Sequence, residues 1–556
     1  MHSHQLRHYL TVFLLALALR LILLDAPPLS DTEAPWALQA HQIAAGEHPP
    51  LGAQIAYIHL TAALFYLFQS TNFLARLVPA LTGTALTWFP YLFRKRLRPA
   101  PGLLLSIFLA LDPGLVALSR QAGSPILAVT FALFALALWD NDHPRSAGLF
   151  AGLALLSGAA LWPGLLGLGL TWGLWRSWLS PQSFSETTLL PPKDRKTALA
   201  YAGGVLLLLG SLFLLSPAGL TAWLNGLPAY LRGWWAPSYV PAWRLLAALL
   251  TYEPLALGLA LIGSLRAWWE NRLRFRLFAL WLLSALLLAL LYPGRQVSDL
   301  GWALIPLWGL AALELARHLQ VPKESRLETW SVATLTVVLL GFAWLDLLGF
   351  VRLSWPLPEA SARLILFIGA LLLLIISLFL IGMGWSAQIA KGGGLYGLLI
   401  IFGIYTLGAA WGTSGLRTPG AIELWDPAPH PAQAHLLAQT VSEISEWSSG
   451  DKQAQPVTIV GVNSPALEWL LRRHSPQVRP LLDPAAAPPL VITRSGENLQ
   501  QSAVYRGQDF GWNRQAAWEE MDAFTWLRWM TLRTAPVQTE NLILWVRDDL
   551  FIDRSR

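Results

Sequence analysis

The sequence predicts an all-α polytopic membrane protein that carries a C-terminal soluble α/β domain. Of the 556 residues, 54% are hydrophobic and only 13% are charged, about half the roughly 25% charged residues of soluble proteins. The charged residues are also unevenly spread. Residues 421–556 hold 16 acidic and 12 basic residues, about 21% of that stretch, against about 10% in residues 1–420. We therefore expect lipid to surround the first part and water to surround the tail.

Apolar runs recur along the chain as far as Trp411. A helix needs roughly 20 residues to cross the hydrocarbon of a bilayer, and about 13 segments approach this length. No small-residue cleavage site follows the first of them, so we expect it to be an uncleaved span. The multi-span domain is predicted over residues 1–412, with spans at 9–24, 73–93, 100–118, 124–140, 146–161, 163–176, 199–215, 247–265, 277–292, 300–316, 328–349, 364–384 and 393–412.

The basic residues predict the orientation of these spans. If the N-terminus is cytoplasmic, the predicted inner segments hold 18 of the 27 Lys and Arg of residues 1–420, including the cluster at 94–98. Cytoplasmic loops of membrane proteins are enriched in Lys and Arg. We therefore expect a plasma-membrane protein whose N-terminus is cytoplasmic and whose tail is extracytoplasmic.

Two further regions are predicted outside the membrane. Residues 25–72 contain an amphipathic stretch at 33–45 and an apolar helix at 51–68, which we expect on the outer face. The tail, residues 421–556, predicts a helix at 431–448 and then alternating strands and helices. Strands are expected at 456–461, 490–493, 504–505 and 541–546, and a second helix at 464–474. This order indicates a small α/β domain.

Composition and hydropathy also exclude several classes of function. The chain has no cysteine, which rules out disulfides and thiol chemistry. Its pI near 9.6 comes from the membrane part, so it does not indicate nucleic-acid binding. The hydropathy shows no paired broken helices and no internal repeat, which disfavours a transporter.

Acidic residues are scarce in the membrane part, so Asp31 and Glu33 stand out. They follow the Pro27-Pro28 break after the first span. One interpretation is helix capping, with Ser30 or Asp31 at the N-cap and Glu33 in the first turn. The other is catalytic, because a carboxylate in a cleft at the membrane surface can act as a general base.

The segment Pro28-Leu-Ser-Asp-Thr-Glu-Ala-Pro-Trp-Ala37 resembles the acidic first-loop motif of GT-C fold membrane glycosyltransferases. These enzymes, typified by protein O-mannosyltransferases and aminoarabinose transferases (glycosyltransferase families 39 and 83), use polyprenyl-phosphate sugars. The similarity continues through His48-Pro-Pro-Leu51, Ala75–Gly83, Arg94–Leu97 and Ser119–Ala122. The segment Trp545–Phe551 resembles a flippase-activity-associated subgroup.

The resemblance implies a multi-span GT-C fold and an inverting sugar transfer on the outer membrane face. A lipid-phosphate sugar would enter laterally, and Asp31 would deprotonate the acceptor hydroxyl with Glu33 as its neighbour. Two departures from the family pattern concern this chemistry. Thr32 separates the two acids, and Ser124 stands where the family often has another acid.

Other residues are candidates for binding the substrate. Arg295, in a short outer turn, is expected to hold the lipid phosphate, since arginine binds phosphate with two hydrogen bonds; a snorkelling interfacial arginine is the alternative. Arg120 either binds substrate or anchors a helix. Glu253, with Tyr252 before it, is expected to line a polar cavity. Trp235 lies in an aromatic loop that indicates either an interfacial belt or stacking on a sugar.

Histidine spacing gives little support to a metal site. His41, His48 and His59 lie near the two acids but lack the helical spacing of metal ligands. We expect no cofactor, with a divalent metal as the weaker alternative, and we place His48 among the substrate-binding candidates because it lies in a matched motif.

Taken together, these features predict a membrane glycosyltransferase that moves a sugar from a polyprenyl-phosphate donor to a protein, glycan or lipid acceptor. The alternative is a non-catalytic member of the fold that assists the flipping of lipid-linked sugars or scaffolds a glycosylation complex. Membrane lipid is an expected partner of either protein, and nucleic acid is not.

Overall fold

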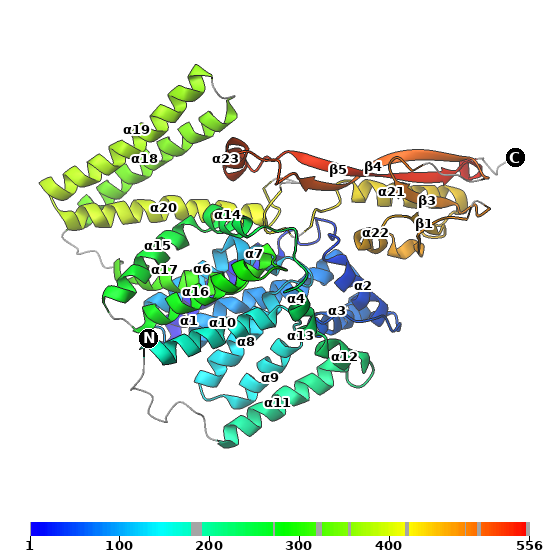
Figure 1. Cartoon of the computed structure of the whole chain (residues 1–556), viewed down its shortest axis with the longest axis horizontal. Coiled ribbons are helices and arrows are strands. Elements are labelled where there is room, and N and C mark those ends of the chain that lie inside the picture. Colours follow the sequence, from blue (N-terminus) through cyan, green and yellow to red (C-terminus); the bar gives the residue numbers. More distant parts are fainter. Residues whose placement is uncertain are drawn as a thin grey trace.

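The computed structural model describes residues 2–179, 192–270, 273–318, 325–353, 357–417, 422–426, 428–483, 485–497 and 502–551. A helical body forms one end of the molecule, and a tail built around a β-sheet lies along the same long axis at the other end (Figure 1). The helices α18 (Arg326–Arg352) and α19 (Pro358–Gly384) form a hairpin that extends away from the body.

Each predicted span coincides with a helix or with a run of helices. By length and hydropathy, five helices among the described residues can cross a membrane, or up to seven if each bent pair is one span. The other helices of the body are shorter. The body comprises α1 (His2–Leu21), α4 (Asn72–Ala85), η1 (Leu86–Trp88), α5 (Phe89–Leu92), α6 (Pro99–Leu111), α7 (Pro113–Ser119), α8 (Ile126–Asp140), α9 (Pro144–Leu155), α10 (Leu161–Leu174), η2 (Trp175–Leu179), α11 (Pro192–Gly210), α12 (Ala218–Leu224), α13 (Gly226–Arg232), α14 (Ala242–Tyr252), α15 (Pro254–Trp269), α16 (Leu273–Leu291), η4 (Val297–Leu300), α17 (Gly301–His318), α18, α19 and α20 (Ala387–Thr413).

The expectation of no paired broken helices is wrong. The α6–α7 pair bends by 57° and the α14–α15 pair by 98°. Both breaks lie before a proline, Pro113 and Pro254, which disfavours helical geometry in the residue before it. Hydropathy averaged over a window cannot register a bend of this kind, because the residues on both sides are apolar.

Residues 25–72, which we call the first outer segment after their predicted position, contain two helices, as the sequence predicts. These are α2 (Ala34–Ala44) and α3 (Ile55–Phe68). On α2, Ala34, Ala37 and Ala40 form a stripe of small buried residues, and α2 packs closely against α3. Gly123 has φ +69°, and a Cβ there would lie 2.2 Å from the Trp36 ring, so the loop before α8 requires glycine at this position.

The tail contains a mixed five-stranded sheet of order β2-β1-β3-β5-β4. Strands β1 (Val457–Val460), β2 (Gln477–Arg479) and β3 (Leu490–Arg494) pair in parallel, and β5 (Val537–Arg547) pairs antiparallel with β3 and with β4 (Tyr505–Ala516). The tail helices are α21 (Ala434–Ser449), α22 (Pro465–Leu470), α23 (Ala523–Leu532) and the short η6 (Arg472–His474) and η7 (Asp548–Phe551). The predicted β-α-β order is present, while β2, α23 and most of β4 were not predicted.

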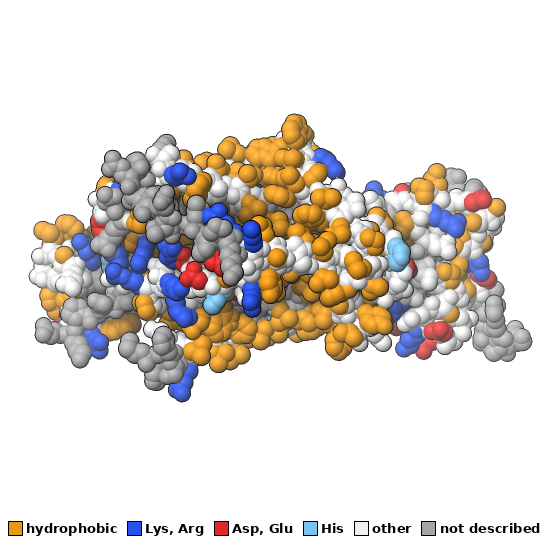
Figure 2. Space-filling model, turned by 90° about the horizontal axis from the view of Figure 1, so that it is seen from below, with side chains coloured by type: hydrophobic (Ala, Val, Ile, Leu, Met, Phe, Trp, Pro, Cys, Tyr) orange, Lys and Arg blue, Asp and Glu red, His pale blue; other side chains and the backbone are white. Residues whose placement is uncertain are grey.

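Charge and hydrophobicity are distributed along the long axis. Figure 2 shows hydrophobic side chains over the middle of the molecule and Lys and Arg gathered at the end of the body opposite the tail. The tail carries both signs of charge (Figure 2). A hydrophobic belt between two polar ends is the arrangement that a bilayer requires.

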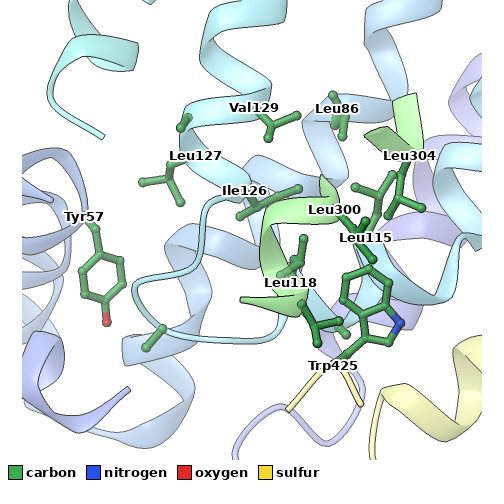
Figure 3. Packing of buried hydrophobic residues seen from close by; sticks show 14 of the residues in the cluster. Tyr57, Leu86, Leu115, Leu118, Ile126, Leu127, Val129, Leu300, Leu304 and Trp425 are labelled. Carbon is green, nitrogen blue, oxygen red and sulfur yellow. The ribbon is translucent and has the colours of Figure 1, made fainter. Parts of the chain in front are cut away.

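A tryptophan of the chain between α20 and the tail is buried in the body and attaches the tail to it. Trp425 is 1% exposed, and its indole lies among Leu115, Leu118, Leu300 and Leu304 (Figure 3). A Cβ on Gly114 would lie 2.4 Å from this indole, so the glycine leaves the space that the ring occupies. The linker between α20 and the tail is therefore part of the hydrophobic core of the body.

Candidate functional site

Glu33 and Arg76 form a buried ion pair where the first outer segment meets α4. Arg76 Nε donates to Glu33 Oε1 at 2.8 Å, and Arg76 Nη2 donates to Oε2 at 2.7 Å. Both side chains are 2% exposed. The same guanidinium donates to the carbonyls of Leu24, Pro27 and Pro28, which fixes the turn that follows α1.

Glu33 accepts hydrogen bonds from the backbone as well. The N–H groups of Ser30 and Ala122 donate to its two oxygens at 3.1 and 3.0 Å. Burial by itself raises the pKa of Glu33, but the charge and hydrogen bonds of Arg76 outweigh it and bring the pKa down to about 2. Glu33 is therefore ionised, and both of its oxygens are hydrogen-bonded. It joins the turn after α1, α4 and the loop before α8.

Asp31 contacts the tail rather than its own helix. Its Oδ1 accepts hydrogen bonds from the Ser464 hydroxyl at 2.6 Å and from the Ala466 N–H at 3.0 Å. Ser464 is the N-cap of α22, so Asp31 lies at the N-terminus of a tail helix. The Asp31 side chain is half-buried, and the capping of α2 expected from the sequence is not the contact that it makes.

Further contacts hold the tail over the first outer segment. Trp469 Nε1 donates to Asn72 Oδ1 at 2.8 Å, and Arg472 donates to the hydroxyl and the carbonyl of Ser70. The Arg472 guanidinium also lies 4.0 Å from the centre of the Trp469 ring. We call this contact between residues 25–72 of the body and residues 422–474 of the tail the seam.

The linker brings two ionisable groups to the seam that the sequence analysis did not consider. Asp426 and His430 both lie close enough to feel the charges of Glu33 and Arg76. Burial, followed by the charges of Glu423 and Glu33, raises the pKa of Asp426 to about 8. Burial lowers the pKa of His430. A signal was present in Trp425-Asp-Pro-Ala-Pro-His430, where an acid follows a large apolar anchor in a proline-stiffened segment.

Arg120 is occupied by the end of α1. Its guanidinium donates to the carbonyls of Leu19, Arg20, Ile22 and Leu23, and the residue is 7% exposed. These are carbonyls that the helix itself leaves unpaired at its C-terminal end. These contacts fit the interpretation that Arg120 anchors a helix rather than the one that it binds substrate.

Arg295 lies in the turn between α16 and η4, next to the loop that carries Trp235. Its Nη1 donates to the Val240 carbonyl at 3.4 Å, and the Ser238 hydroxyl donates to the Arg295 carbonyl at 2.6 Å. Its Nε has no hydrogen-bond partner in the described part of the chain. Trp235 is 79% exposed, so its ring is free to contact lipid or a ligand.

Tyr252 and Glu253 lie at the corner between α14 and α15, and both are completely buried. The Tyr252 hydroxyl donates to Glu423 in the linker and accepts from the Leu424 N–H. Arg533 of the tail pairs with the same Glu423 at 3.4 Å and lies over the Tyr252 ring. Tyr252 thus joins the body to the tail.

His48 is exposed on the loop after α2. Among the described residues, no group of three or more His, Cys, Asp or Glu side chains is arranged to hold a metal ion. Ser124, which stands where the resembling family often has another acid, is buried and donates to the Leu118 carbonyl at 2.5 Å.

The structure therefore brings some of the candidates together and separates others. Asp31 and Glu33 share one turn, and Asp426 and His430 join them from the linker. Arg295 and Trp235 lie on two adjacent segments, and no hydrogen bond or ion pair among the described residues joins Arg295 to Asp31.

Comparison with solved structures identifies the architecture. The crystal structure of ArnT from Cupriavidus metallidurans bound to undecaprenyl phosphate aligns with a TM-score of 0.54 and 13% identity, over 98% of this chain and 99% of that one. The apo structure of the same protein aligns with a TM-score of 0.51 and 14% identity, over 88% and 93%. The chain has the GT-C fold. No family model and no curated protein matches the sequence.

The GT-C fold confirms the predicted fold class of a multi-pass membrane protein with a C-terminal domain. At 13% identity the likeness concerns the fold, and the roles of individual residues rest on the geometry of this chain. That geometry places the half-buried Asp31 carboxylate at a seam that also holds the half-buried Asp426.

Proposed function

We propose that the protein is a membrane glycosyltransferase that transfers a sugar from a polyprenyl-phosphate donor to an acceptor at the outer face of the plasma membrane, with inversion. The observation that carries the proposal is the half-buried Asp31 carboxylate at the seam of a GT-C fold. The Lys and Arg at the end opposite the tail support a cytoplasmic N-terminus and an extracytoplasmic tail (Figure 2).

In this proposal Asp31 is the general base that takes the proton of the acceptor hydroxyl. One of its oxygens, Oδ1, is oriented by Ser464 and the Ala466 N–H, and Oδ2 accepts no hydrogen bond from the described residues. A base must lie within hydrogen-bond reach of the proton that it removes, and Oδ2 meets this requirement for a hydroxyl that enters the seam. Glu33 acts as a positioning residue, because its bonds to Arg76 hold the turn that carries Asp31.

Arg295 is the proposed contact of the donor phosphate. Arg20, Arg76 and Arg120 are buried and bonded within the body, whereas Arg295 is only partly buried and donates one long hydrogen bond, to the Val240 carbonyl. The exposed Trp235 on the adjacent loop offers a surface for the sugar or the polyprenyl chain, and the exposed His48 is a further candidate contact. Arg120 anchors the end of α1, and Tyr252, next to Glu253, binds the linker.

The proposal is tested with the full-length protein in nanodiscs and radiolabelled polyprenyl-phosphate sugars. We expect the wild type to transfer or release the label and Asp31→Asn to lose at least about 100-fold of this rate, in the range of a missing general base. Ser464→Ala, which removes one orienting bond, serves as the matched control and is expected to retain most of the activity. Equal turnover by the wild type and Asp31→Asn would exclude the assigned base.

A second candidate function is supported by the same contacts. Glu33 is neutralised by Arg76, and Asp31 already accepts two hydrogen bonds from the tail. These contacts suit a non-catalytic GT-C protein that binds lipid-linked sugars and assists their flipping or scaffolds a complex. Saturable binding of the polyprenyl-phosphate sugar without any transfer would favour this function.

A further inference from the structure

The two broken helices of the body meet at a pair of buried acids. Asp112 separates α6 from α7, and Glu253 separates α14 from α15. Both residues are 0% exposed, and their carboxyl groups are in contact with one another. A buried acid at a break in an apolar helix is costly unless it is paired or has a function.

The two acids differ in their hydrogen bonds. Asp112 accepts from the Leu115 N–H and from the Trp308 indole N–H, one on each oxygen. Neither oxygen of Glu253 receives a hydrogen bond from any donor in the described part of the chain. The carboxyl group within its reach is Asp112, which is an acceptor when ionised. Glu253 therefore lacks a donor unless one of the two acids carries a proton.

Charge balance leads to the same requirement. Arg20 is completely buried and donates to the carbonyls of Leu109 and Ala110, just before Asp112. With both acids ionised, this cluster would hold two negative charges against one positive charge. With one proton between Asp112 and Glu253, the cluster is neutral and the proton supplies the missing hydrogen bond.

The corner that carries Glu253 is also the attachment point of the linker. Tyr252, the preceding residue, donates to Glu423, which pairs with Arg533 of the tail. The Tyr405 hydroxyl of α20 donates to the carbonyl of Thr251 on the same turn. A change in the position of Glu253 therefore acts on the contacts that seat the tail on the body.

We propose that Asp112 and Glu253 form a single-proton binding site, and that release of this proton loosens the linker from the α14–α15 corner. The ionisable and charged groups that face the site are Arg20 on α1, Tyr252 on α14, Tyr405 on α20, and Glu423 with Arg533 behind Tyr252. Two ionised carboxylates in contact repel each other in a buried site, and the repulsion moves Glu253 and the turn before it. The proposal does not depend on the reaction proposed above.

Infrared spectroscopy of the full-length protein in nanodiscs tests whether the proton is present. We expect the wild type at neutral pH to show the carbonyl band of a protonated carboxyl group that Glu253→Gln lacks. Asp112→Asn, whose amide can donate to an ionised Glu253, is expected to lack the same band, and it keeps the test open if Glu253→Gln does not fold. Identical carboxyl bands in the wild type and the folded variant would overturn the proposal.

Hydrogen–deuterium exchange of residues 422–433 tests the coupling. After correction for intrinsic exchange rates, we expect the wild-type linker to exchange at least several-fold faster at high pH than at neutral pH. Glu253→Gln, which imitates the protonated acid, is expected to remain protected over the same range. The same pH dependence in both proteins would overturn the coupling.

Discussion

Helices α17 and α19 both consist almost entirely of apolar residues, yet their surroundings are opposite. The most apolar 18-residue stretch of the segment that includes α17 is 89% buried within the protein. The corresponding stretch of α19 is 11% buried. Small residues account for part of the difference. Gly309 on α17 lies against the Phe278 ring, whereas a Cβ on Gly369 of α19 would meet nothing within 4 Å. Hydropathy identifies a span, and close packing decides whether its neighbour is protein or lipid.

The same contrast applies to ion pairs. Arg76 and Glu33 are 2% exposed and bind with two hydrogen bonds, while Arg96 pairs with Asp140 with its own side chain 63% exposed. Removing one partner of a buried pair leaves an uncompensated charge, whereas exposed pairs contribute little. Each prediction below compares a buried group with a counterpart in other surroundings.

The largest effect is expected from Arg76→Ala. Leaving Glu33 buried and unpaired should cost about 3–5 kcal/mol of stability, measured by thermal unfolding in detergent. Arg96→Ala is the matched control, with an expected loss of about 1 kcal/mol or less. Equal losses for the two variants would contradict the conclusion that the buried Glu33–Arg76 pair stabilises the fold.

The two carboxyl groups near the seam should give opposite dependences on pH. Because the pKa of Glu33 is lowered to about 2, its contribution to stability is present above its ordinary pKa of 4.5 and is lost as the pH falls from there toward about 2. That contribution is roughly 3 kcal/mol, and Glu33→Gln should remove this dependence.

Asp426 should behave in the reverse manner. Its pKa is raised from 3.8 to about 8, so the unfolded chain releases this proton first and stability falls as the pH rises from about 4 to about 8. Asp426→Asn should flatten this fall. Melting temperatures over this range that decline as steeply in Asp426→Asn as in the wild type would refute the assignment.

A smaller effect is expected when packing alone is changed. Gly309→Ala places a methyl group 2.4 Å from the Phe278 ring and should cost about 1–3 kcal/mol through overpacking. Gly369→Ala, which meets no neighbour in the protein, should leave the melting temperature unchanged or slightly raised. Equal melting temperatures for the two variants would contradict the proposed difference in packing around these glycines.

The smallest expected effect is that of Ser464→Ala. It removes one of the two hydrogen bonds to Asp31, together with the N-cap bond from the Leu467 N–H and the bond from the Trp512 indole. The loss should cost about 1–2 kcal/mol, visible as faster proteolysis of the linker. Ser442→Ala on α21, whose hydroxyl donates to a carbonyl of its own helix, is the control that should leave proteolysis unchanged. If the linker is cleaved at the same rate in both variants, the Ser464–Asp31 contact does not hold the tail on the body.

The spans were predictable because hydropathy is a local property of the chain. The α2 and α3 helices and the β-α-β start of the tail followed from local patterns in the same way. Strand β4 was largely missed, since half of its residues are exposed and its sequence shows no regular apolar alternation.

The site was less predictable, because its contacts join distant residues. Glu33 and Arg76 are 43 positions apart, and Asp31 and Ser464 are 433 apart. The sequence indicated that Asp31 and Glu33 matter, but not that one binds the tail and the other a buried arginine. Asp426 was overlooked because, apart from Glu423, the charged groups that act on it come from distant segments.

Photo-crosslinking of a polyprenyl-phosphate analogue to the full-length protein in nanodiscs tests the central claim, that the tail end of the body binds the lipid donor. We expect the crosslinks, located by mass spectrometry, on residues 25–50, 233–240 and 292–300, and we expect unlabelled polyprenyl phosphate to compete with them. Competed crosslinks confined to the opposite end, at residues 94–98 and 266–276, would contradict the account.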